Sequence, residues 1–182
     1  MCVIKTIKEG SFSSRKILEM WNNNPDGAGI GVLDKSNTLI KPFKSKDFKE
    51  FQTNLDLVFQ NQDFNQVVIH FRRRSRGSYD LVNVNPIPVN KDTLFFHNGT
   101  FGNLNEEYLS DSNIFVRDFI SEIKEFDISD LNTELKIVNL LNGNTSRMVF
   151  LQTGVEKPLI IDIANKGYWD ESKNIWTSNR EH

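Results

Sequence analysis

The chain has 182 residues, a formal net charge of -2 and a single cysteine. This length suits one domain, which buries roughly 70% of the surface of its unfolded chain and holds a core without metals or disulfides. One cysteine excludes an internal disulfide and fits a reducing compartment, so we expect a cytoplasmic protein. The small net charge gives no general attraction to nucleic acid, and no apolar run approaches the ~20 residues of a membrane span.

Hydrophobic periodicity and turn residues predict strands in blocks, with helices between the blocks. In chain order the pattern predicts a strand at 2–7, a helix at 13–21, a loop at 22–31 that enters a strand, a strand at 38–41, a helix at 47–59, strands at 66–71 and 94–97, helices at 113–125 and 131–141, and strands at 147–152, 159–163 and 175–177. This order favours an α+β fold with largely antiparallel sheets over a doubly wound parallel sheet.

The single cysteine, Cys2, stands directly behind the initiator methionine. If Met1 is removed, one residue carries both a nucleophilic thiol and a free α-amine that can act as its base. An N-terminal-nucleophile hydrolase needs this arrangement. A cysteine at position 2 also arises by chance, so the interpretation depends on whether the chain supplies an oxyanion hole and a substrate clamp.

Five short motifs, the first of which contains Cys2, follow one another along the chain. They are MC at 1–2, NPDGAGIGV at 24–32, HFRRRSRG at 70–77 with NVNP at 83–86, HNG at 97–99 and SDSNIF at 110–115. Together, in this order, they resemble the class II glutamine amidotransferase domain, and most closely its short stand-alone members. The resemblance implies a four-layer αββα sandwich of the N-terminal-nucleophile hydrolase type. It also implies that residues 1–182 form a single glutaminase domain with no synthase domain.

The activity implied by the resemblance is hydrolysis of the side-chain amide of L-glutamine to glutamate and ammonia, through a thioester on Cys2. The tetrahedral oxyanion needs donors placed in advance, and HNG offers the side-chain amide of Asn98 and the backbone N–H of Gly99. Taken alone, HNG also fits an ordinary turn after a strand, because Asn-Gly is a common turn pair.

The family's substrate clamp falls on Arg72 for the α-carboxylate of glutamine and on Asp111 for its α-ammonium. Ser75 and Gly27 are further candidate substrate contacts. Each has an alternative interpretation: Asp111 could cap the helix that follows it, and Gly27 could form a tight turn into a strand. Arg72 could belong to a solvated basic run that includes Arg73, Arg74 and Arg76. For those three neighbours the solvated run is the preferred interpretation, and a patch for an anionic partner is the second one.

Two histidines, His70 and His97, are expected to be buried scaffold residues rather than catalysts. Because the histidines lie far apart and lack metal-ligand spacing, we expect no metal, and no cofactor is implied. The chain departs from the family pattern at several positions. Ser75 stands where threonine is usual, Asn85 replaces a histidine and Asn113 replaces a glutamate.

The sequence leaves the fate of ammonia open. Because the chain has no glycine-rich nucleotide-binding loop, ammonia would pass to a separate synthase partner or be released. One alternative function is an amidase of the same fold that acts on a γ-glutamyl or peptide-like amide. The other is a non-catalytic binding module that kept the fold. Convergence of Arg72 and Asp111 on a pocket sized for glutamine would separate the first alternative, and retention of Met1 in cells would favour the second.

Overall fold

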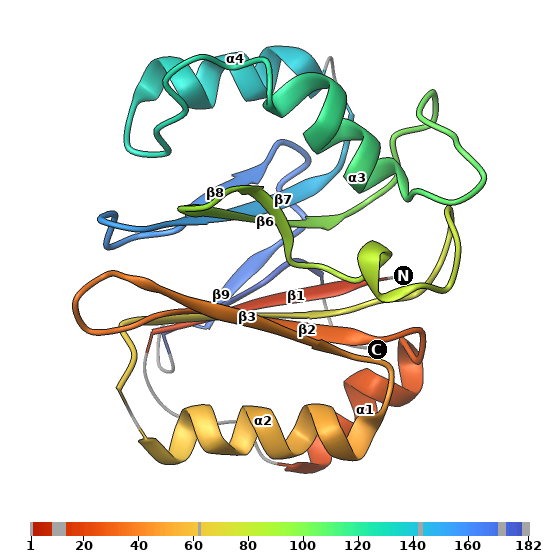
Figure 1. Ribbon diagram of the computed structural model, residues 1–182, viewed down its shortest axis with the longest axis vertical. Coiled ribbons are helices and arrows are strands. Elements are labelled where there is room, and N and C mark those ends of the chain that lie inside the picture. The colour runs from red at the N-terminus through yellow and green to blue at the C-terminus, as the bar shows by residue number, and fades with distance from the viewer. Residues whose placement is uncertain (1, 9–13, 62, 142–143, 171–173, 180–182) are drawn as a thin grey trace.

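The computed structural model describes residues 2–8, 14–61, 63–141, 144–170 and 174–179. Figure 1 shows four stacked layers: two helices, a sheet, a second sheet and a further helical layer. Neighbouring strands in both sheets are antiparallel. The predicted α+β fold and the four-layer αββα sandwich are therefore confirmed.

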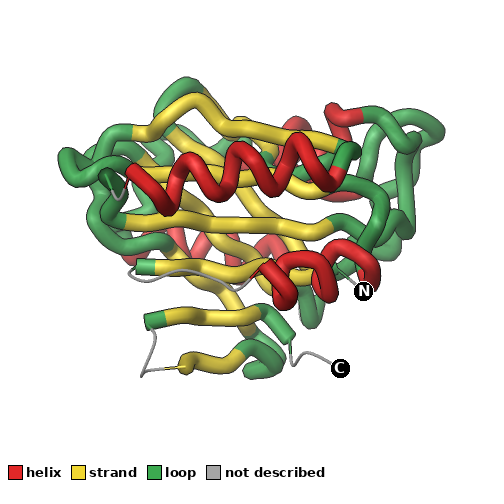
Figure 2. Tube along the Cα trace, turned by 90° about the horizontal axis from the view of Figure 1, so that it is seen from below, coloured by secondary structure: helices red, strands yellow, loops and turns green. Residues whose placement is uncertain are grey.

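The larger sheet has six strands in the order β3-β2-β4-β1-β10-β9. The strands are β1 (Val3–Ile7), β2 (Ala28–Leu33), β3 (Leu39–Ser45), β4 (Gln66–Phe71), β9 (Tyr168–Asp170) and β10 (Ile175–Thr177). Helices α1 (Ser14–Asn23) and α2 (Phe48–Asn61) lie across the outer face of this sheet, as Figure 2 shows. Buried aromatic and aliphatic side chains of these two helices pack on that face.

The smaller sheet has four strands in the order β5-β6-β7-β8. They are β5 (Ile87–Asn90), β6 (Thr93–Asn98), β7 (Arg147–Gln152) and β8 (Leu159–Asp162), and a 3-10 turn η1 (Leu81–Asn83) precedes them. Helix α3 (Asp111–Phe115), a π-helical turn η2 (Val116–Ile120) and helix α4 (Leu131–Leu141) cover the outer face. No helix in the described part of the chain is long and apolar enough to cross a membrane.

Several predicted bounds differ from the structure. The helix predicted at 113–125 begins at Asp111 and ends at Ile120, after the π-helical turn. Strands β5 and β9 were not predicted, because they have only four and three residues and lack a clear alternating run. Strand β3 extends to Ser45, since pairing with β2 continues across a register shift. Residue 13, the predicted start of the first helix, lies outside the described residues.

The layer between the two sheets is apolar along most of its length. Side chains alternate across a strand, so residues that do not face the helices face the opposite sheet. The buried members of this layer are Ile4, Leu33, Val68, Leu94, Phe96, Val149, Leu151 and Trp176. In both sheets, side chains therefore alternate between the helix-facing side and the side that faces the other sheet. This alternation shows which residues at the strand ends also point between the sheets.

Candidate active site

Polar residues replace apolar ones at one end of the layer between the sheets. A step of two residues keeps a side chain on the same face of a strand. One step beyond the apolar inner positions lie Cys2 before β1, Asn98 on β6 and Arg147 on β7. Asn98 and Arg147 are direct cross-strand partners. The alternation that builds the core therefore also places these three side chains.

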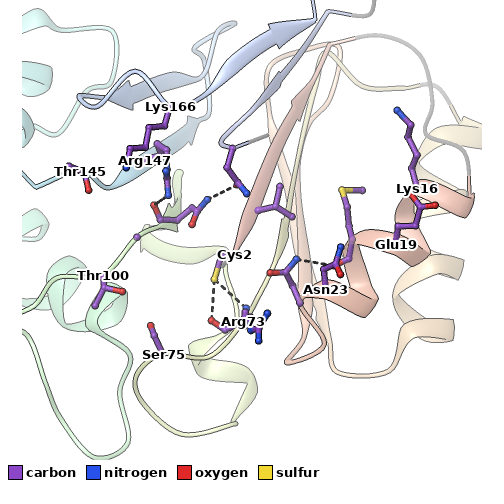
Figure 3. Close-up of a pocket in the computed structure, with 16 residues that line it drawn as sticks. Cys2, Lys16, Glu19, Asn23, Arg73, Ser75, Thr100, Thr145, Arg147 and Lys166 are labelled. Carbon is purple, nitrogen blue, oxygen red and sulfur yellow. Dashed lines mark hydrogen bonds between the residues drawn. The ribbon is translucent and has the colours of Figure 1, made fainter. Parts of the chain in front are cut away.

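These three residues line one open cavity of about 730 Å³, shown in Figure 3. A second space, of only about 20 Å³, adjoins it. The smaller space is also lined by Cys2, together with Arg72 and Asp111. Cys2 thus lies between a large open cavity and a small polar one.

Six of the seven predicted site residues meet around these two spaces. The small space is lined by Cys2, Arg72, Ser75, Gly99 and Asp111, and the large cavity by Cys2, Ser75, Asn98 and Gly99. The seventh, Gly27, is buried and lines neither of them. Its carbonyl accepts a hydrogen bond from the backbone N–H of Arg72 at 2.8 Å. At φ +119° a Cβ on Gly27 would also lie 2.8 Å from Val84 Cγ2, so the turn requires glycine.

The thiol of Cys2 is held by the backbone of Arg73. Sγ accepts from the Arg73 N–H at 3.3 Å and lies 3.4 Å from the Arg73 carbonyl, to which it donates. Cys2 keeps part of its surface exposed, yet burial of the sulfur raises the pKa of the thiol and the hydrogen bond from Arg73 opposes this shift. A raised pKa means that the thiol needs a nearby base to become a nucleophile.

The side chain of Asn98 is bonded to the C-terminal segment. Its Nδ2 donates to Ser178 Oγ at 2.8 Å and to Asn179 Oδ1 at 2.9 Å. Its Oδ1 is buried and has no hydrogen-bond partner within the described ranges. Both amide hydrogens are therefore engaged in this conformation. To donate to an oxyanion, Asn98 must exchange one of these bonds or rotate its amide.

Gly99 follows in a closely packed turn. A Cβ at this position would lie 2.2 Å from Ser146 Oγ and 2.9 Å from His97 Nε2, so no larger residue fits. Gly99 lines both the large and the small space. A turn after β6 and a backbone donor at the site are therefore compatible interpretations of HNG.

Arg72 is buried rather than part of a solvated run, with 4% of its surface exposed. Its Nη2 donates to the carbonyls of Arg76 and Ser78, at 3.1 Å each. Its Nη1 is buried without a hydrogen-bond partner among the residues that the structure describes. Burial lowers the pKa of Arg72, and nearby Cys2 acts in the opposite direction. The guanidinium stays charged, so Nη1 is a donor that a ligand could satisfy.

Asp111 is buried and already accepts two hydrogen bonds. Oδ2 accepts from the Phe101 N–H at 2.8 Å and Oδ1 from the Ser112 N–H at 2.9 Å. Burial raises the pKa of this carboxyl, and both hydrogen bonds oppose that effect. The interpretation of Asp111 as a helix cap is wrong: Ser110 is the N-cap of α3, and Asp111 is its first residue. Each oxygen keeps a lone pair for a further donor.

The neighbouring arginines differ in their environments. The Arg74 guanidinium lies 4.1 Å from the centre of the Tyr79 ring. Arg76 donates to the carbonyls of Gly102 and Leu104, at 3.0 and 3.2 Å. Both therefore hold loops together in addition to carrying charge. The exposed side chain of Arg73 lines the large cavity.

Three asparagines support the loops around the site. The Asn83 amide donates to the carbonyls of Ser78 and Tyr108, and its oxygen accepts from the Ser110 N–H. Asn113 donates to Asn83 Oδ1 at 3.1 Å. Asn85 belongs to the same NVNP motif as Asn83, and its Oδ1 accepts a hydrogen bond from the His97 N–H at 3.0 Å. Asn85 and Asn113 thus brace the backbone of the loops around the site.

The two histidines expected in the scaffold are buried. His97 lies within hydrogen-bond distance of Ser112 Oγ at 2.7 Å and Ser146 Oγ at 2.9 Å, one on each ring nitrogen. Neither ring nitrogen of His70 makes a well-formed hydrogen bond in the described part of the chain, although the backbone of His97 lies close enough to oppose part of the shift in the pKa of His70. Burial lowers the pKa of each histidine to about 3. Both are neutral at physiological pH.

The lowered pKa values of His70 and His97 predict that the protein loses stability in mild acid. A histidine whose pKa falls from about 6.5 unfolded to about 3 folded stabilises the fold fully above pH 6.5, and this stabilisation is lost as the pH falls toward 3. Between pH 7 and pH 5 we expect the free energy of unfolding to fall by about 2 kcal/mol per histidine. Urea unfolding at the two pH values measures it.

A matched variant isolates one histidine. His70→Met keeps a buried apolar side chain of similar size and removes the ring that titrates. We expect this variant to lose about half of the pH dependence. An unchanged slope would show that His70 is not responsible.

Arg147 is a site residue that the sequence reasoning missed. It is 5% exposed, lines the large cavity, and its Nη2 donates to the Asn98 carbonyl at 3.2 Å. The alternation of RMVFLQ could have revealed it, because Arg147 shares its strand face with Val149 and Leu151.

Among the described residues, no three His, Cys, Asp or Glu side chains are grouped so that they could hold a metal.

Solved structures with this architecture are similar over nearly the whole chain, and three of them each match 97% of it. A glutamine phosphoribosylpyrophosphate amidotransferase from B. subtilis has a TM-score of 0.55 at 15% identity, over 41% of its own chain. A structure of the allosteric regulatory enzyme of purine biosynthesis has a TM-score of 0.52 at 15% identity, also over 41%. A glutamine aminotransferase class-II domain protein from Silicibacter pomeroyi has a TM-score of 0.52 at 11% identity, over 87%.

The fold is therefore that of class II glutamine amidotransferase domains, as the motifs predicted. The chain spans about 41% of the length of the first two structures. No protein-family model and no curated protein matches the sequence. At 11–15% identity the likeness concerns the fold, and the activity has to be argued from the site.

Proposed function

We propose that this protein hydrolyses the side-chain amide of L-glutamine to glutamate and ammonia, with Cys2 as the nucleophile. The observation that carries the proposal is the meeting of Cys2 with Arg72, Asp111 and Gly99 around one small space. A thiol, a buried cation and a buried carboxylate match the amide, the α-carboxylate and the α-ammonium of glutamine. The shared fold of class II domains supports the same reading.

The reaction begins after removal of Met1, which frees the α-amine of Cys2. A free thiol titrates near ~8.5 and an α-amine near ~8, so the amine can take the thiol proton. Burial raises the pKa of the Cys2 thiol, which makes this base necessary. Sulfur then attacks the amide carbon, and the ammonium of Cys2 returns the proton to the departing ammonia. Water cleaves the thioester and releases glutamate.

The amino-acid end of glutamine has to enlarge the smaller space. At about 20 Å³ it has room for roughly one water molecule. Its wall includes exposed Arg73 and Ser75, which belong to the loop after β4. Movement of this loop would let the α-carboxylate reach Arg72 Nη1 and the α-ammonium reach Asp111. Ser75 is proposed as a further contact from the same loop.

A direct test combines two measurements on one preparation. Intact mass spectrometry establishes whether Cys2 is the first residue, and an ammonia-release assay measures glutamine hydrolysis. We expect activity only in protein that has lost Met1. Protein with a free Cys2 amine and no hydrolysis of glutamine would contradict the proposal and favour one of the two alternatives.

The clamp predicts that charge at the amino-acid end controls the rate. A charged hydrogen bond contributes about 1.5–3 kcal/mol, or roughly ten- to a hundredfold in kcat/KM. Glutamine with its α-carboxylate capped as an amide should react that much more slowly than free glutamine. Arg72→Ala should lose most activity on free glutamine and stop discriminating against the capped compound. Steady-state kinetics on the two substrates measures this ratio.

Arg74→Ala is the matched control, because Arg74 belongs to the same basic run but lines neither space beside Cys2. It should keep the parental ratio. Asp111→Asn should similarly lose discrimination against N-acetylglutamine. If the parent hydrolyses doubly capped glutamine as fast as free glutamine, Arg72 and Asp111 are not the clamp.

The wider setting is part of the proposal. We take residues 1–182 as one glutaminase domain that acts in the cytoplasm and passes ammonia to a synthase partner. One observation favours a second candidate, an amidase acting on γ-glutamyl amides. The cavity of about 730 Å³ beside Cys2 is far larger than departing ammonia requires.

A further inference from the structure

The large cavity has a charge opposite to that of the whole chain. Its described lining contains four cationic side chains, Lys16, Arg73, Arg147 and Lys166, and a single acidic one, Glu19. The chain as a whole carries a net charge of -2. Positive charge is therefore concentrated at this cavity, and it favours an anionic ligand.

Arg147 is the buried member of this set. Only 5% of its surface is exposed, and one of its nitrogens donates to the Asn98 carbonyl at 3.2 Å. Its cross-strand partner on β8 is Asp162, whose charge partly compensates the guanidinium. A buried cation is costly without such compensation. Arg147 therefore lies fixed at the cavity wall, beside the predicted oxyanion residue.

Lys166 belongs to a turn that the same aspartate fixes. The backbone N–H groups of Lys166 and Gly167 donate to the two oxygens of Asp162, at 3.1 and 2.6 Å. The exposed side chain of Lys166 lines the cavity together with Arg147, and Figure 3 shows both on the side opposite Lys16. Asp162 thus organises two cations from different segments at one wall.

Cys2, the proposed nucleophile, lines the same cavity as Arg147 and Lys166, so this wall lies at the reaction site. Cys2 lines both spaces, whereas Arg72 and Asp111 line only the small one. A substrate whose α-carboxylate and α-ammonium lie at the small space therefore directs the group that leaves its amide into the large cavity. A volume of about 730 Å³ is within the usual range of small-molecule sites, roughly 300–1,000 Å³.

We propose that this cavity binds an anionic group on the amine portion of a γ-glutamyl amide, with Arg147 and Lys166 as its contacts. The inference rests on the proposed function and names a substrate class for the same site. The chemistry is unchanged: Cys2 sulfur bonds to the γ-carbonyl carbon, and the C–N bond breaks. The amine leaves with the proton that the thiol gave up, and water then releases glutamate. The departing amine is larger than ammonia and negatively charged elsewhere.

Two isosteric compounds test the inference by binding alone. γ-Glutamylglycine ends in a carboxylate, and γ-glutamylglycinamide ends in a neutral amide of similar shape. Calorimetric titration of the Cys2→Ala protein, which cannot turn them over, gives both dissociation constants. We expect the carboxylate compound to bind at least about tenfold more tightly, since a charged hydrogen bond contributes this much.

Variants then assign the preference to the cavity. Lys166→Met, at an exposed position, should reduce the ratio several-fold, and Arg147→Met should bring it close to one. Lys157→Met is the matched control, because Lys157 is an exposed lysine that does not line the cavity. Its ratio should match the parent. Because Arg147 is buried, Lys166→Met keeps the test decisive if Arg147→Met does not fold.

The outcomes separate this inference from the proposed function. Equal affinity for the two compounds overturns the inference, and so does a preference that survives both cavity variants. Glutamine hydrolysis is measured separately on parental protein with a free Cys2. Hydrolysis of glutamine without a carboxylate preference leaves the proposed function in place and removes the inference. A carboxylate preference in protein that does not hydrolyse glutamine keeps the binding site and rejects the proposed activity.

Discussion

Replacing Cys2 with alanine is expected to abolish glutamine hydrolysis and covalent labelling together. The side chain is the only thiol in the chain, and it lies between the two spaces of the site. Loss of a nucleophile removes the covalent route entirely, so we expect kcat to fall by at least about 10³-fold. Ammonia release measures the rate. Mass spectrometry after treatment with a glutamine-analogue electrophile measures the labelling.

Cys2→Ser provides the matched variant. It keeps the side-chain shape and the fold, but a hydroxyl is far less ionised than a thiol, so most of the rate should be lost. Protein that retains Met1 is a second comparison, because the nitrogen of Cys2 is then an amide and cannot act as a base. Labelling that persists in Cys2→Ala would show that the electrophile reacts elsewhere.

The order of the motifs was enough to predict the fold, even though the sequence is only 11–15% identical to solved structures with that fold. The helices at α2 and α4 and the strands at β4, β7 and β10 lie where periodicity placed them. These elements have strong patterns of their own. Strands β5 and β9 have no such pattern, and they exist because neighbouring strands offer them hydrogen-bond partners.

From the sequence it was possible to predict which residues form the candidate site, but not how they are arranged and bonded. Motifs selected Cys2, Arg72 and Asp111, and tertiary folding brings them around one space. Local spacing does not determine which hydrogen bonds a side chain makes once buried. For this reason the capping role of Ser110, in place of Asp111, could not be read from the sequence. Cavity volume depends on every wall at once, so it too required the structure.

The position of Arg147 at the site follows from the alternation of its strand. An arginine at an inner-face position of a strand is unusual, because a buried charge requires compensation. The pattern RMVFLQ places it with two apolar residues on that face. Its compensation by Asp162 comes from the next strand, which only the register of β7 and β8 reveals.

Replacement of Asn98 is the second substitution for which we expect a large effect, and the kind of effect depends on which of two roles Asn98 has. As an oxyanion donor, Asn98 acts on charge that develops in the transition state. Asn98→Ala should then lower kcat by about 10²–10³ with little change in substrate affinity. As an anchor of the C-terminal segment, Asn98 would act through its bonds to Ser178 and Asn179. Its removal would then reduce stability more than the rate of the chemical step.

Asn179→Ala separates the two roles. This variant removes one of the acceptors that engage Nδ2 of Asn98 and leaves Asn98 itself in place. If Nδ2 must exchange that bond for the oxyanion, Asn179→Ala should keep kcat at the parental value or raise it. Asn98→Ala should still lose about 10²–10³. Steady-state kinetics with urea unfolding on both variants measures rate and stability together. Equal losses of kcat in the two variants would assign Asn98 to the anchor and remove it from the oxyanion hole.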